Sequence, residues 1–519
     1  MRRFVTVAVV AVVIGVVVAV TVIGSRGSSP APAAQFPAAQ TSAAFHPAPV
    51  TWGPCTDRVL TAAGAGCGTV TVPLDRADPA GPTVELAVSR VRHTVPDANY
   101  QGVVLVNPGG PGGSGLALST LGASVPNGVG ASYDWIGFDP RGVGASRPAL
   151  SCIPAYAGYG RPDYDPGTPG AEDGWLRRAA GYAAACGRSG GALLRHMTTV
   201  DSATDMDSIR QALGVQQITY YGYSYGSYLG QVYGTLFSAR VRRMVLDGVV
   251  DPRNVWYQAN LGQDVAFEKN IGIFFDWVAK YDDVYHLGNS GTDVEKLYYA
   301  QKQKLRATPA GGVVGPSEWN DLFLAAGYNV GSWEKVAAAF SRWVTSGDAQ
   351  GLRTAYESSA STTDDNTYAV YLAVQCTDAG WPTDWATWRD DNTRAAVAAP
   401  FETWGNAWYN APCRTWPTPS GTPVQIDGGG VASTLLISET LDGATPYSGA
   451  LQARQLFPHA SLVEGVGGTS HATSLSGDTC VDGAVAAYLA TGALPIRRPG
   501  DGSDTQCAPP PPPTPAADG

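Results

Sequence analysis

The sequence predicts an α/β fold with a mostly parallel, doubly wound sheet and an inserted, mainly helical cap. Short apolar runs recur in the first half of the chain with helical patterns between them, which is typical of strand–helix–strand units. The stretch from Gln217 to Gly230 begins as an apolar strand, passes through a sharp glycine-flanked turn and continues with helical spacing. From residue 253 to 423 the chain instead looks helical, carries most of the tryptophans and shows no strong parallel-strand run.

At 519 residues the chain is long enough for a large core and for a second domain or a big insertion. Charged residues make up only 15%, while 63 glycines and 38 prolines indicate many tight turns. The net charge of −10 argues against nucleic-acid binding and fits a positively charged substrate or partner. No C-x-x-C or H-x-x-x-H spacing is present, so we expect neither a metal site nor a cofactor.

Residues 1–33 are expected to form a signal peptide or a membrane anchor. Arg2 and Arg3 precede a long uncharged, apolar run, which is typical of a secretory signal. The run is also long enough to span a bilayer, so an uncleaved anchor, and with it a membrane contact, stays open. The small residues of Ala31-Pro32-Ala33 favour cleavage. In either case we expect a secreted, extracellular or membrane-anchored protein, with residues 34–50 as a linker.

Eight cysteines in an exported chain indicate disulfide bonds. The simplest hypothesis pairs neighbours along the chain: Cys55 with Cys67, Cys152 with Cys186, Cys376 with Cys413, and Cys480 with Cys507. The sequence alone does not fix this connectivity.

The sheet is expected to form from two separated parts of the chain, residues 51–252 and 424–507, with the cap of residues 253–423 between them. An alternating, half-buried antiparallel pair opens the first part, and continuous apolar runs predict strands covered on both faces. The predicted strands are Thr69–Leu74, Val84–Val91, Gly102–Val106, Asp134–Phe138, Ile218–Tyr221, Arg243–Leu246, Ser433–Ser438 and Ser461–Val466. Asp201 is expected to cap a helix that ends at Leu213, and the proline-rich tail of residues 508–519 is expected to be disordered.

The turn Gly222-Tyr223-Ser224-Tyr225-Gly226 fits the G-x-S-x-G pattern of a nucleophile elbow, in which a serine lies on a strained turn between a strand and a helix. The flanking glycines are a steric requirement, since side chains there would collide with neighbouring backbone. The pentapeptide alone occurs often by chance. The strand before it and the helix after it make it a specific signal for Ser224 as a nucleophile.

A serine hydroxyl needs a base, usually histidine, and an acid that orients this base. After such an elbow the chain order is serine, acid, histidine. His286 falls in the predicted cap and His459 precedes a strand, whereas His471 follows the last strand in a glycine-rich loop, at the strand end where sites lie. We therefore expect His471 to be the base, against the alternative of a solvated loop histidine.

Asp442 follows the strand Ser433–Ser438 at its C-terminal end and lies between Ser224 and His471 in the chain. An aspartate in a turn more often caps backbone N–H groups, but this position favours Asp442 as the acid. Asp251, after the preceding core strand, is the alternative.

Two backbone N–H groups must face the oxyanion of a tetrahedral intermediate. One is expected to be that of Tyr225, directly after the nucleophile. The other is expected from the loop Asn107–Gly115, whose glycines let the backbone approach a substrate closely. A phosphate-binding glycine loop is the alternative, but the P-loop lysine and the spacing of a dinucleotide fingerprint are missing.

Several motifs resemble those of a known family. Asn107-Pro-Gly-Gly-Pro-Gly-Gly-Ser-Gly115 resembles the HGGPG loop of proline iminopeptidases, with Asn-Pro where His-Gly would start. Together with DPRGVGAS, GYSYG, TLDGATP and GGTSH, it is similar to the secreted tripeptidyl-aminopeptidase branch of the α/β-hydrolases, roughly from Thr51 to Pro495. The resemblance implies an α/β-hydrolase fold, a serine exopeptidase activity and Gly110 as the first-loop oxyanion donor. Gln375-Cys376-Thr377-Asp378 and the paired Cys413 also look like this branch.

An aminopeptidase must hold the free ammonium of its peptide substrate, which calls for carboxylates near the site. Asp264 and Glu268 lie four residues apart in a predicted cap helix, where a cation between them would relieve the repulsion of like charges. A solvated acidic face is the plainer interpretation. Glu439, with Asp247 and Asp251, is a rival candidate near the predicted strand ends.

Three functional hypotheses follow. The first is a secreted serine exopeptidase that releases tripeptides or other short peptides from free N-termini, through Ser224, Asp442 and His471 and an acyl-enzyme intermediate. The second is an esterase or lipase on the same triad, since the family includes such members. The third is a non-catalytic surface-binding protein, which the complete and correctly ordered triad disfavours. An epoxide hydrolase, suggested by DPRGVGAS, would need aspartate in place of Ser224.

Overall fold

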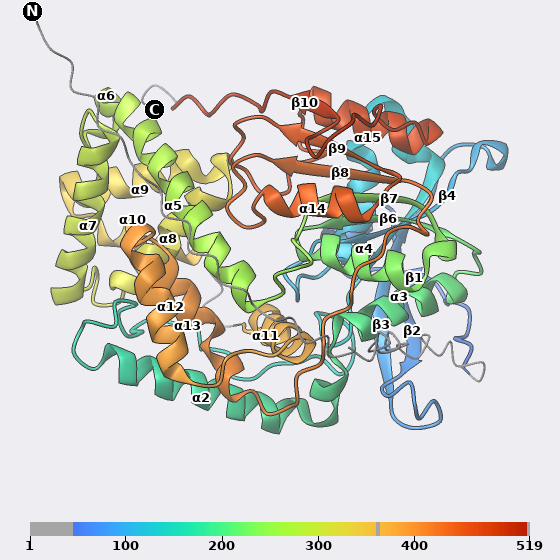
Figure 1. Ribbon diagram of the computed structural model, residues 1–519, viewed down its shortest axis with the longest axis horizontal. Coiled ribbons are helices and arrows are strands. Elements are labelled where there is room, and N and C mark those ends of the chain that lie inside the picture. The colour runs from blue at the N-terminus through green and yellow to red at the C-terminus, as the bar shows by residue number, and fades with distance from the viewer. Residues whose placement is uncertain (1–44, 360–363, 516–519) are drawn as a thin grey trace, which may run out of the picture. The chain divides into compact units, whose positions relative to one another are not determined.

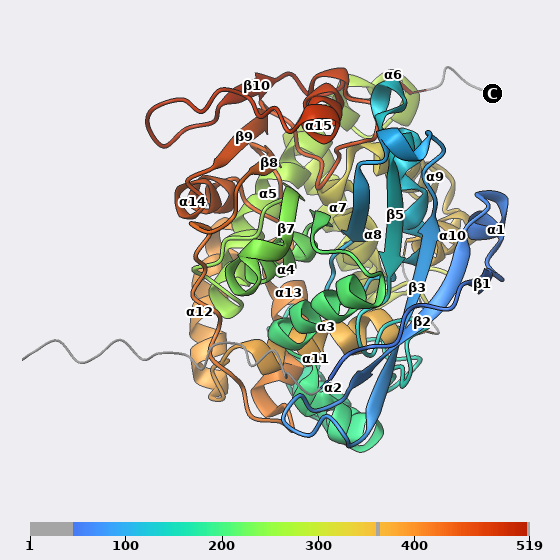
Figure 2. The ribbon, with the colours of Figure 1, turned by 90° about the vertical axis from the view of Figure 1, so that its right-hand side faces the viewer.

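The computed structural model describes residues 45–359 and 364–515, and in this part of the chain the strands form one ten-stranded sheet (Figures 1 and 2). The strands are β1 (Gly53–Pro54), β2 (Gly66–Pro73), β3 (Thr83–Val91), β4 (Gly102–Asn107), β5 (Tyr133–Phe138), β6 (Ile218–Tyr223), β7 (Val241–Asp247), β8 (Thr434–Glu439), β9 (Ala460–Gly465) and β10 (Thr505–Cys507). Their order across the sheet is β1-β2-β3-β5-β4-β6-β7-β8-β9-β10.

The sheet is antiparallel at one side and parallel elsewhere. β1, β2, β3 and β5 pair antiparallel, and all pairs from β5 through β4 to β10 are parallel. The predicted mostly parallel sheet with an opening antiparallel pair is therefore confirmed. Each predicted strand is present with small shifts at its ends, and the structure adds the short strands β1 and β10.

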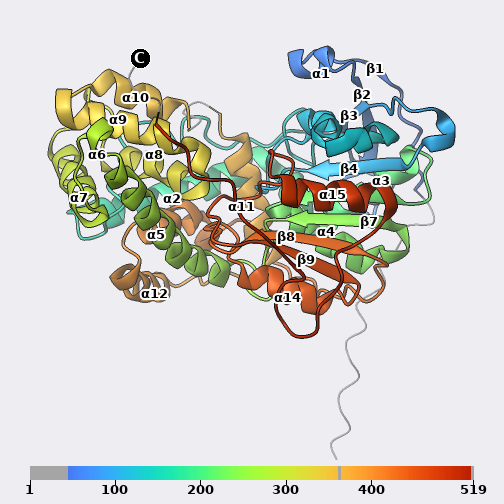
Figure 3. The same ribbon diagram turned by 90° about the horizontal axis from the view of Figure 1, so that it is seen from above.

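Helices cover both faces of the sheet. In Figure 3, α15 (Thr479–Thr491) lies over one face with the 3-10 segments η2 (Leu116–Ser124) and η3 (Pro126–Ser132), while α4 (Tyr225–Leu236) and α14 (Ser448–Leu456) lie over the other. Side chains alternate between the faces of a strand, so every second residue belongs to the same core. One such core contains Val104, Val106, Leu435, Ile437, Val485 and Leu489.

Between β7 and β8 the chain forms what we term the helical region, residues 257–415. Its elements are α5 (Tyr257–Lys280), α6 (Asp282–Tyr285), α7 (Gly291–Ala307), α8 (Pro316–Tyr328), η6 (Val330–Ser332), α9 (Trp333–Ser346), α10 (Ala349–Glu357), α11 (Asn366–Asp378), α12 (Trp385–Ala398), α13 (Thr403–Asn410) and η7 (Ala411–Thr415). They gather at one side of the sheet in Figures 1 and 3. Buried aromatic residues, including Phe274, Trp319, Phe323 and Trp333, form the core of this region.

A segment from the first half of the chain also packs on the helical region. It follows β5 and contains α2 (Ala171–Gly190), which runs beside the helices in Figure 1. The Arg161 guanidinium donates to Asp321 Oδ2 at 2.6 Å, and the stacked rings of Trp175 and Trp408 have centroids 6.0 Å apart. Part of the stretch that the sequence assigns to the sheet thus contacts the helices.

The four disulfide bonds pair neighbouring cysteines as hypothesised: Cys55–Cys67, Cys152–Cys186, Cys376–Cys413 and Cys480–Cys507. The bond between Cys376 and Cys413 joins α11 to η7 inside the helical region.

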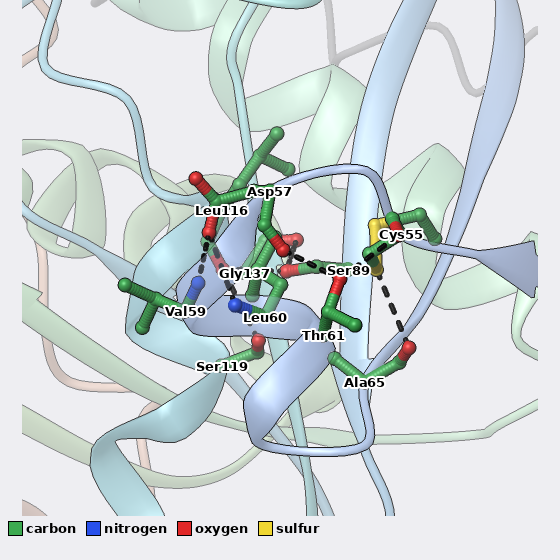
Figure 4. The surroundings of a disulfide bond; sticks show 11 residues. Cys55, Asp57, Val59, Leu60, Thr61, Ala65, Ser89, Leu116, Ser119 and Gly137 are labelled. Carbon is green, nitrogen blue, oxygen red and sulfur yellow. Dashed lines mark hydrogen bonds between the residues drawn. A yellow bond between two sulfur atoms is a disulfide. The ribbon is translucent and has the colours of Figure 1, made fainter.

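Figure 4 shows the surroundings of Cys55 at the antiparallel edge of the sheet. The disulfide joins the loop before α1 (Arg58–Ala62) to β2. Asp57 caps α1, since its carboxylate accepts the N–H groups of Val59 at 2.8 Å and Leu60 at 3.0 Å. The Thr61 hydroxyl returns a hydrogen bond to the Cys55 carbonyl at 3.0 Å. The disulfide and the cap together fix the chain where it enters the sheet.

The helix predicted to begin at Asp201 begins earlier. α3 (Thr199–Ala212) has Thr198 as its N-cap, so the prediction of an Asp201 cap is wrong. The Thr198 hydroxyl accepts the Asp201 N–H at 3.1 Å, and the Asp201 carboxylate accepts the Thr198 N–H at 3.2 Å. This reciprocal pair is a capping box, in which the acid occupies the third helical position.

The ends of the chain are described only in part. Trp277 Nε1–H donates to the Pro513 carbonyl at 2.9 Å, which holds a portion of the proline-rich tail against α5. The expected leader, residues 1–33, lies outside the described residues. Within the ranges that are described, no helix has both the length and the apolarity needed to cross a membrane.

Candidate active site

Ser224 lies between β6 and α4 in a strained backbone conformation. Its φ is 56° and its ψ is −126°, a combination that residues with a side chain rarely adopt. A Cβ on Gly222 would lie 2.3 Å from the Gly226 carbonyl oxygen, and one on Gly226 would lie 2.7 Å from that of Asn107. The steric reason expected for both glycines is present, and the turn has the geometry of a nucleophile elbow.

The elbow is bonded to the neighbouring strand. The Ser224 N–H donates to the carbonyl of Asp247, the last residue of β7, at 2.9 Å. The Ser224 carbonyl accepts the hydroxyl of Ser227 at 2.6 Å. Because β6 and β7 are parallel neighbours, these bonds hold the partly buried serine at the C-terminal end of the sheet.

Asp442 and His471 are in direct contact. They follow the parallel neighbours β8 and β9, and His471 Nδ1 lies 2.8 Å from Asp442 Oδ2 and 3.0 Å from Oδ1. The same carboxylate accepts the N–H groups of Ala444 and Thr445 and the Thr445 hydroxyl, at 2.8, 2.9 and 2.8 Å. Asp442 is therefore a buried acid with all its hydrogen bonds made, and it accepts the Nδ1–H of His471. This leaves Nε2 of His471 as the nitrogen that can accept a proton.

The charges around His471 favour its protonated form. Burial alone would lower the pKa of this histidine, but the charge and hydrogen bond of Asp442 and the charge of Asp247 outweigh burial and raise the pKa. Asp247 accepts both the N–H and the hydroxyl of Ser474, and burial raises its own pKa to about 6. An imidazolium at His471 is thus stabilised by Asp442 in contact and by Asp247 nearby.

Asp251, the alternative acid, is engaged elsewhere. Its carboxylate forms a two-point ion pair with Arg253, with N–O distances of 2.9 and 2.6 Å. The acid that the structure brings to His471 is Asp442.

The loop after β4 brings glycine backbone against the elbow. A Cβ on Gly109 would lie 2.9 Å from both Ser224 Cβ and the Tyr225 nitrogen, so no side chain fits there. The Gly109 N–H is bonded to Asn107 Oδ1 at 2.9 Å, whereas the Gly110 N–H has no acceptor within the described part of the chain. Tyr225 is the first residue of α4, where an N–H has no partner inside the helix. Tyr225 thus offers an N–H next to Ser224, and Gly110 offers one directly after Gly109, the loop residue that packs against Ser224.

The helical region is bonded to the loop that carries His471. The His471 N–H donates to the carbonyl of Tyr328, the last residue of α8, at 2.8 Å. Asn270 of α5 donates through Nδ2 to the carbonyl of Thr469 at 3.2 Å. These contacts place α5 and α8 directly over the C-terminal ends of β8 and β9.

Tyr328, Tyr371 and Tyr409 lie close to one another, and the first of them contacts His471. The rings of Tyr328 and His471 meet edge to face, with centroids 5.9 Å apart. Tyr328 and Tyr409 keep 38% and 44% of their surface accessible, although burial raises the pKa of both and of Tyr371.

A cavity in the helical region contains the buried carboxylate of Asp264. Aromatic and amide side chains line it, among them Tyr257, Trp381, Trp388, Asn406 and Asn410. Asn406 Nδ2 donates to Asp264 at 2.9 Å, and burial raises the pKa of Asp264 to about 7. Asn410, which lines this cavity, accepts the hydroxyl of Tyr371 at 3.0 Å, so the cavity lining is bonded to the group of tyrosines beside His471.

The other acids predicted to bind substrate lie elsewhere. Glu268, one turn along α5 from Asp264, accepts the N–H of Phe401 at 2.8 Å. Glu439 packs behind the histidine loop, where it accepts the Thr473 hydroxyl at 3.2 Å and where burial raises its pKa to about 7. Of these three acids, Asp264 is the one that lines the cavity described above.

Glu402 is a buried acid that the sequence analysis missed. It lies at the start of α13 and accepts Asn320 Nδ2 at 2.8 Å. Burial, with the nearby charges of Asp321 and Asp264, raises the pKa of Glu402, and Glu402 in turn raises the pKa of Tyr328. Glu402 is therefore electrostatically coupled to both Asp264 and Tyr328. No local pattern marks it, because its partners come from other helices.

Known proteins are similar to this chain over most of its length. Residues 102–478 match the family described as the alpha/beta hydrolase fold. The tripeptidyl aminopeptidase of Streptomyces coelicolor is 43% identical over 457 residues, which cover 85% of this chain and 83% of that protein. The serine protease Hip1 of Mycobacterium tuberculosis is 32% identical over 475 residues, covering 86% and 90%. Carboxylesterase B of the same organism is 34% identical over 472 residues, covering 86% and 88%.

Proposed function

The chain belongs to the α/β-hydrolase family and is related to its serine exopeptidases, and from this we propose that it releases tripeptides, or other short peptides, from the free N-termini of peptide substrates. The observation that carries the proposal is the bond between Asp442 and His471, at the same end of the sheet as the strained elbow of Ser224. The similarity to a tripeptidyl aminopeptidase supports the choice of substrate.

In the proposed reaction Ser224 is the nucleophile, His471 the base and Asp442 the acid that orients it. His471 Nε2 takes the proton of the Ser224 hydroxyl while Oγ attacks the scissile carbonyl carbon. The resulting oxyanion accepts hydrogen bonds from the N–H groups of Gly110 and Tyr225. When the intermediate collapses, His471 gives its proton to the departing amine, and an acyl-enzyme remains. Water, activated by the same histidine, then hydrolyses the ester on Ser224 and releases the short peptide.

The free ammonium of the substrate is proposed to bind in the cavity of Asp264. A buried carboxylate whose pKa is raised by burial gains most from a cation, since the cation replaces the water that it lost. Glu402, whose pKa is raised by burial and by the charges of Asp321 and Asp264, is electrostatically coupled to this acid, and Trp381 and Trp388 supply apolar walls. Glu268 and Glu439 do not line this cavity and are less favourable anchors.

The helical region is proposed to act as a cap that fixes the length of the released peptide. The substrate would run from Ser224 past Tyr328, which contacts His471, and Tyr371, which is bonded to Asn410 of the cavity, to Asp264. Hydrogen bonds join the helical region, which carries Asp264, to the loop of His471, so the distance from Asp264 to Ser224 is fixed. This distance would determine which peptide bond reaches Ser224.

We place the protein outside the cytoplasm. Four disulfide bonds support this location, because they persist in oxidising compartments. Secretion with cleavage of the leader is the form proposed.

An esterase is the second candidate function. It is favoured by the similarity to carboxylesterase B over most of the chain. It would use the same triad and oxyanion donors but would not need an anchor for an amine.

The deciding experiment compares a chromogenic tripeptide anilide with its N-acetylated form and with a short-chain ester. We expect acetylation to lower kcat/KM by about 100-fold or more, since it removes the charge that Asp264 would bind. Equal turnover of both peptides would reject the aminopeptidase, and turnover of the ester alone would select the esterase. Ser224→Ala serves as the control in each assay and is expected to abolish turnover.

A further inference from the structure

Helix α11 lies between the rest of the helical region and the sheet in both Figure 1 and Figure 3. Its N-terminal end touches the loop of Gly110, since a Cβ on Gly112 would lie 2.4 Å from the Thr367 carbonyl oxygen. Asp378, its last residue, lies roughly 16 Å further along the helix axis. This second end meets the elbow through a chain of hydrogen bonds.

Asp378 is bonded to Thr199, the first residue of α3. Its Oδ1 accepts the Thr199 N–H at 2.7 Å, and its Oδ2 accepts the Thr199 hydroxyl at 2.5 Å. The Thr199 hydroxyl also lies 2.8 Å from the hydroxyl of Tyr225. Burial raises the pKa of Asp378 to about 7; while Asp378 is ionised, the single proton of the Thr199 hydroxyl goes to it, and Tyr225 is then the donor to Thr199. All three side chains are buried, and Thr199 and Asp378 line a cavity between α3 and α11.

The chain of bonds ends on the residue that supplies an oxyanion N–H. The backbone of Tyr225 follows the nucleophile, while its side chain is held at the far end by the Thr199 hydroxyl. Its ring packs against Trp256, with centroids 6.0 Å apart. An oxyanion donor is effective only when it is in place before the reaction. A carboxylate acceptor gives the stronger, charge-assisted kind of hydrogen bond, which suits a residue that must not move.

We propose that Asp378 is a positioning residue for the oxyanion hole: it fixes Tyr225 through the Thr199 hydroxyl and so holds the Tyr225 N–H on the developing oxyanion. The inference rests on the proposed function, because it takes Ser224 as the nucleophile. Asp378 itself contacts neither the substrate nor the reacting atoms. One helix, α11, would then contact the loop of Gly110 directly and reach Tyr225 through Thr199.

A role in stability alone makes a different prediction. It would lower the melting temperature and leave the kcat of the folded enzyme unchanged. A positioning role lowers kcat while KM stays the same, because the oxyanion exists in the transition state and not in the bound substrate. A fall in melting temperature at unchanged kcat therefore indicates a structural role, whereas a fall in kcat at unchanged KM indicates a positioning role.

The first test uses two substitutions of Thr199, with the tripeptide anilide as substrate. Thr199→Val replaces the hydroxyl by a methyl group of similar size and removes both side-chain bonds, while the N–H to Asp378 remains. We expect kcat to fall about tenfold with KM within about twofold, less than the 100-fold or more that follows loss of an oxyanion donor itself. Thr199→Ser keeps the hydroxyl and is expected to restore kcat to within about twofold of the wild type.

Asp378→Asn tests the other end of the chain of bonds. It is expected to lower kcat about as much as Thr199→Val, because it weakens the acceptor of the Thr199 hydroxyl. Asp207→Asn is the matched control. Like Asp378, Asp207 is a buried acid, but it belongs to α3. It accepts hydrogen bonds from Arg210 Nε at 2.7 Å and Gln211 Nε2 at 2.7 Å and has no hydrogen bond to Tyr225 or Thr199. This variant is expected to lower the melting temperature and keep the wild-type kcat.

Wild-type kcat in folded Thr199→Val and Asp378→Asn would overturn the inference. So would an equal loss of kcat in Thr199→Ser or in Asp207→Asn, since the loss would then follow from packing. If Asp378→Asn does not fold, the two Thr199 variants decide. Ser224→Ala tests the proposed function separately. If Ser224→Ala retains turnover, the proposed function is wrong; if it is inactive, the Thr199 and Asp378 variants test the positioning role alone. Should the wild type hydrolyse only esters, the same variants are compared on the ester, whose oxyanion needs the same donors.

Discussion

The Asp442 carboxylate holds the His471 imidazole through both of its oxygens, which lie 2.8 and 3.0 Å from Nδ1. Three further donors, from Ala444 and Thr445, saturate the same carboxylate. The acid therefore has no freedom to turn away, and it fixes one tautomer of the histidine. This arrangement is what allows His471 Nε2 to serve as a base.

Replacing this acid tests its role. Asp442→Asn keeps the shape of the side chain but presents an amide that can donate to Nδ1, which favours the wrong tautomer of His471. We expect kcat to fall by a factor on the order of 10⁴, as for the same change in other triads. Steady-state kinetics on the tripeptide anilide would measure it.

Asp251→Asn is the matched control for that substitution. Asp251 is bonded to Arg253 near the surface rather than to His471, so we expect wild-type kcat. If Asp251→Asn were the inactive variant and Asp442→Asn the active one, the assignment of the acid would be wrong.

The pH dependence of turnover follows from the environment of His471. Burial lowers its pKa, but the Asp442 carboxylate and the charge of Asp247 raise it more, so the pKa lies above its ordinary value. His471 must be neutral to accept the serine proton. We therefore expect kcat/KM to rise with pH through a single step whose midpoint lies above about 6.5.

Asp247→Asn removes one of the charges that raise this pKa. It should move the midpoint of the pH profile downward while the enzyme stays active. A midpoint that does not move, or that moves upward, would contradict the electrostatic account of His471.

The sequence predicts the sheet and the positions of the triad because both depend on local order along the chain. Ser224, Asp442 and His471 each follow a strand directly, and the C-terminal ends of parallel strands meet at one edge of a sheet. The glycines of the elbow are equally local, since each collides with backbone a few residues away or on the next strand.

The contacts of the helical region could not be predicted in the same way. Asp378 meets Thr199 across 179 residues of sequence, and Glu402 meets Asp264 and Tyr328 only through the packing of different helices. A helix pattern indicates which face is apolar, but it does not specify which helix will cover that face. For this reason the sequence indicated Asp264 and Glu268 as a pair, whereas they have separate partners.

The Asp264 cavity is tested by its effect on substrate binding. Asp264→Asn should raise KM for the free tripeptide anilide by about tenfold or more, with a smaller change in kcat, because the anchored ammonium is present in both ground and transition states. Glu268→Asn serves as the control of the same helix and is expected to leave KM within about twofold. A rise in KM for Glu268→Asn alone would reject Asp264 as the anchor.

The same substitution has a predicted effect on stability. Burial raises the pKa of Asp264 to about 7, so between its unfolded pKa of about 3.9 and about 7 the folded state binds more protons than the unfolded state. Stability must therefore fall as pH rises through this window. Asp264→Asn removes this pH dependence. The free energy of unfolding of the variant, relative to that of the wild type, should therefore increase by up to about 4 kcal/mol between pH 4 and pH 8. Denaturant unfolding at the two pH values would measure it, and a constant difference would contradict the buried, unpaired acid.

The Cys376–Cys413 bond closes a loop inside the helical region, with a sequence separation of 37. Replacing both cysteines by serine should cost about 3 kcal/mol of stability. We expect amide exchange to rise mainly in α11 and η7, with the strands of the sheet little changed. Replacing Cys55 and Cys67 instead should leave the helical region protected, and uniform loss of protection in both variants would show that the two parts do not unfold separately.

The proposed release of tripeptides is tested by the identity of the first product formed from an unmodified decapeptide with a free N-terminus. Mass spectrometry at early times is expected to show the N-terminal tripeptide and the complementary heptapeptide, and neither product from the N-acetylated peptide. Release of single amino acids, or equal cleavage of the acetylated peptide, would contradict the proposal of an exopeptidase that measures its product from an anchored amine.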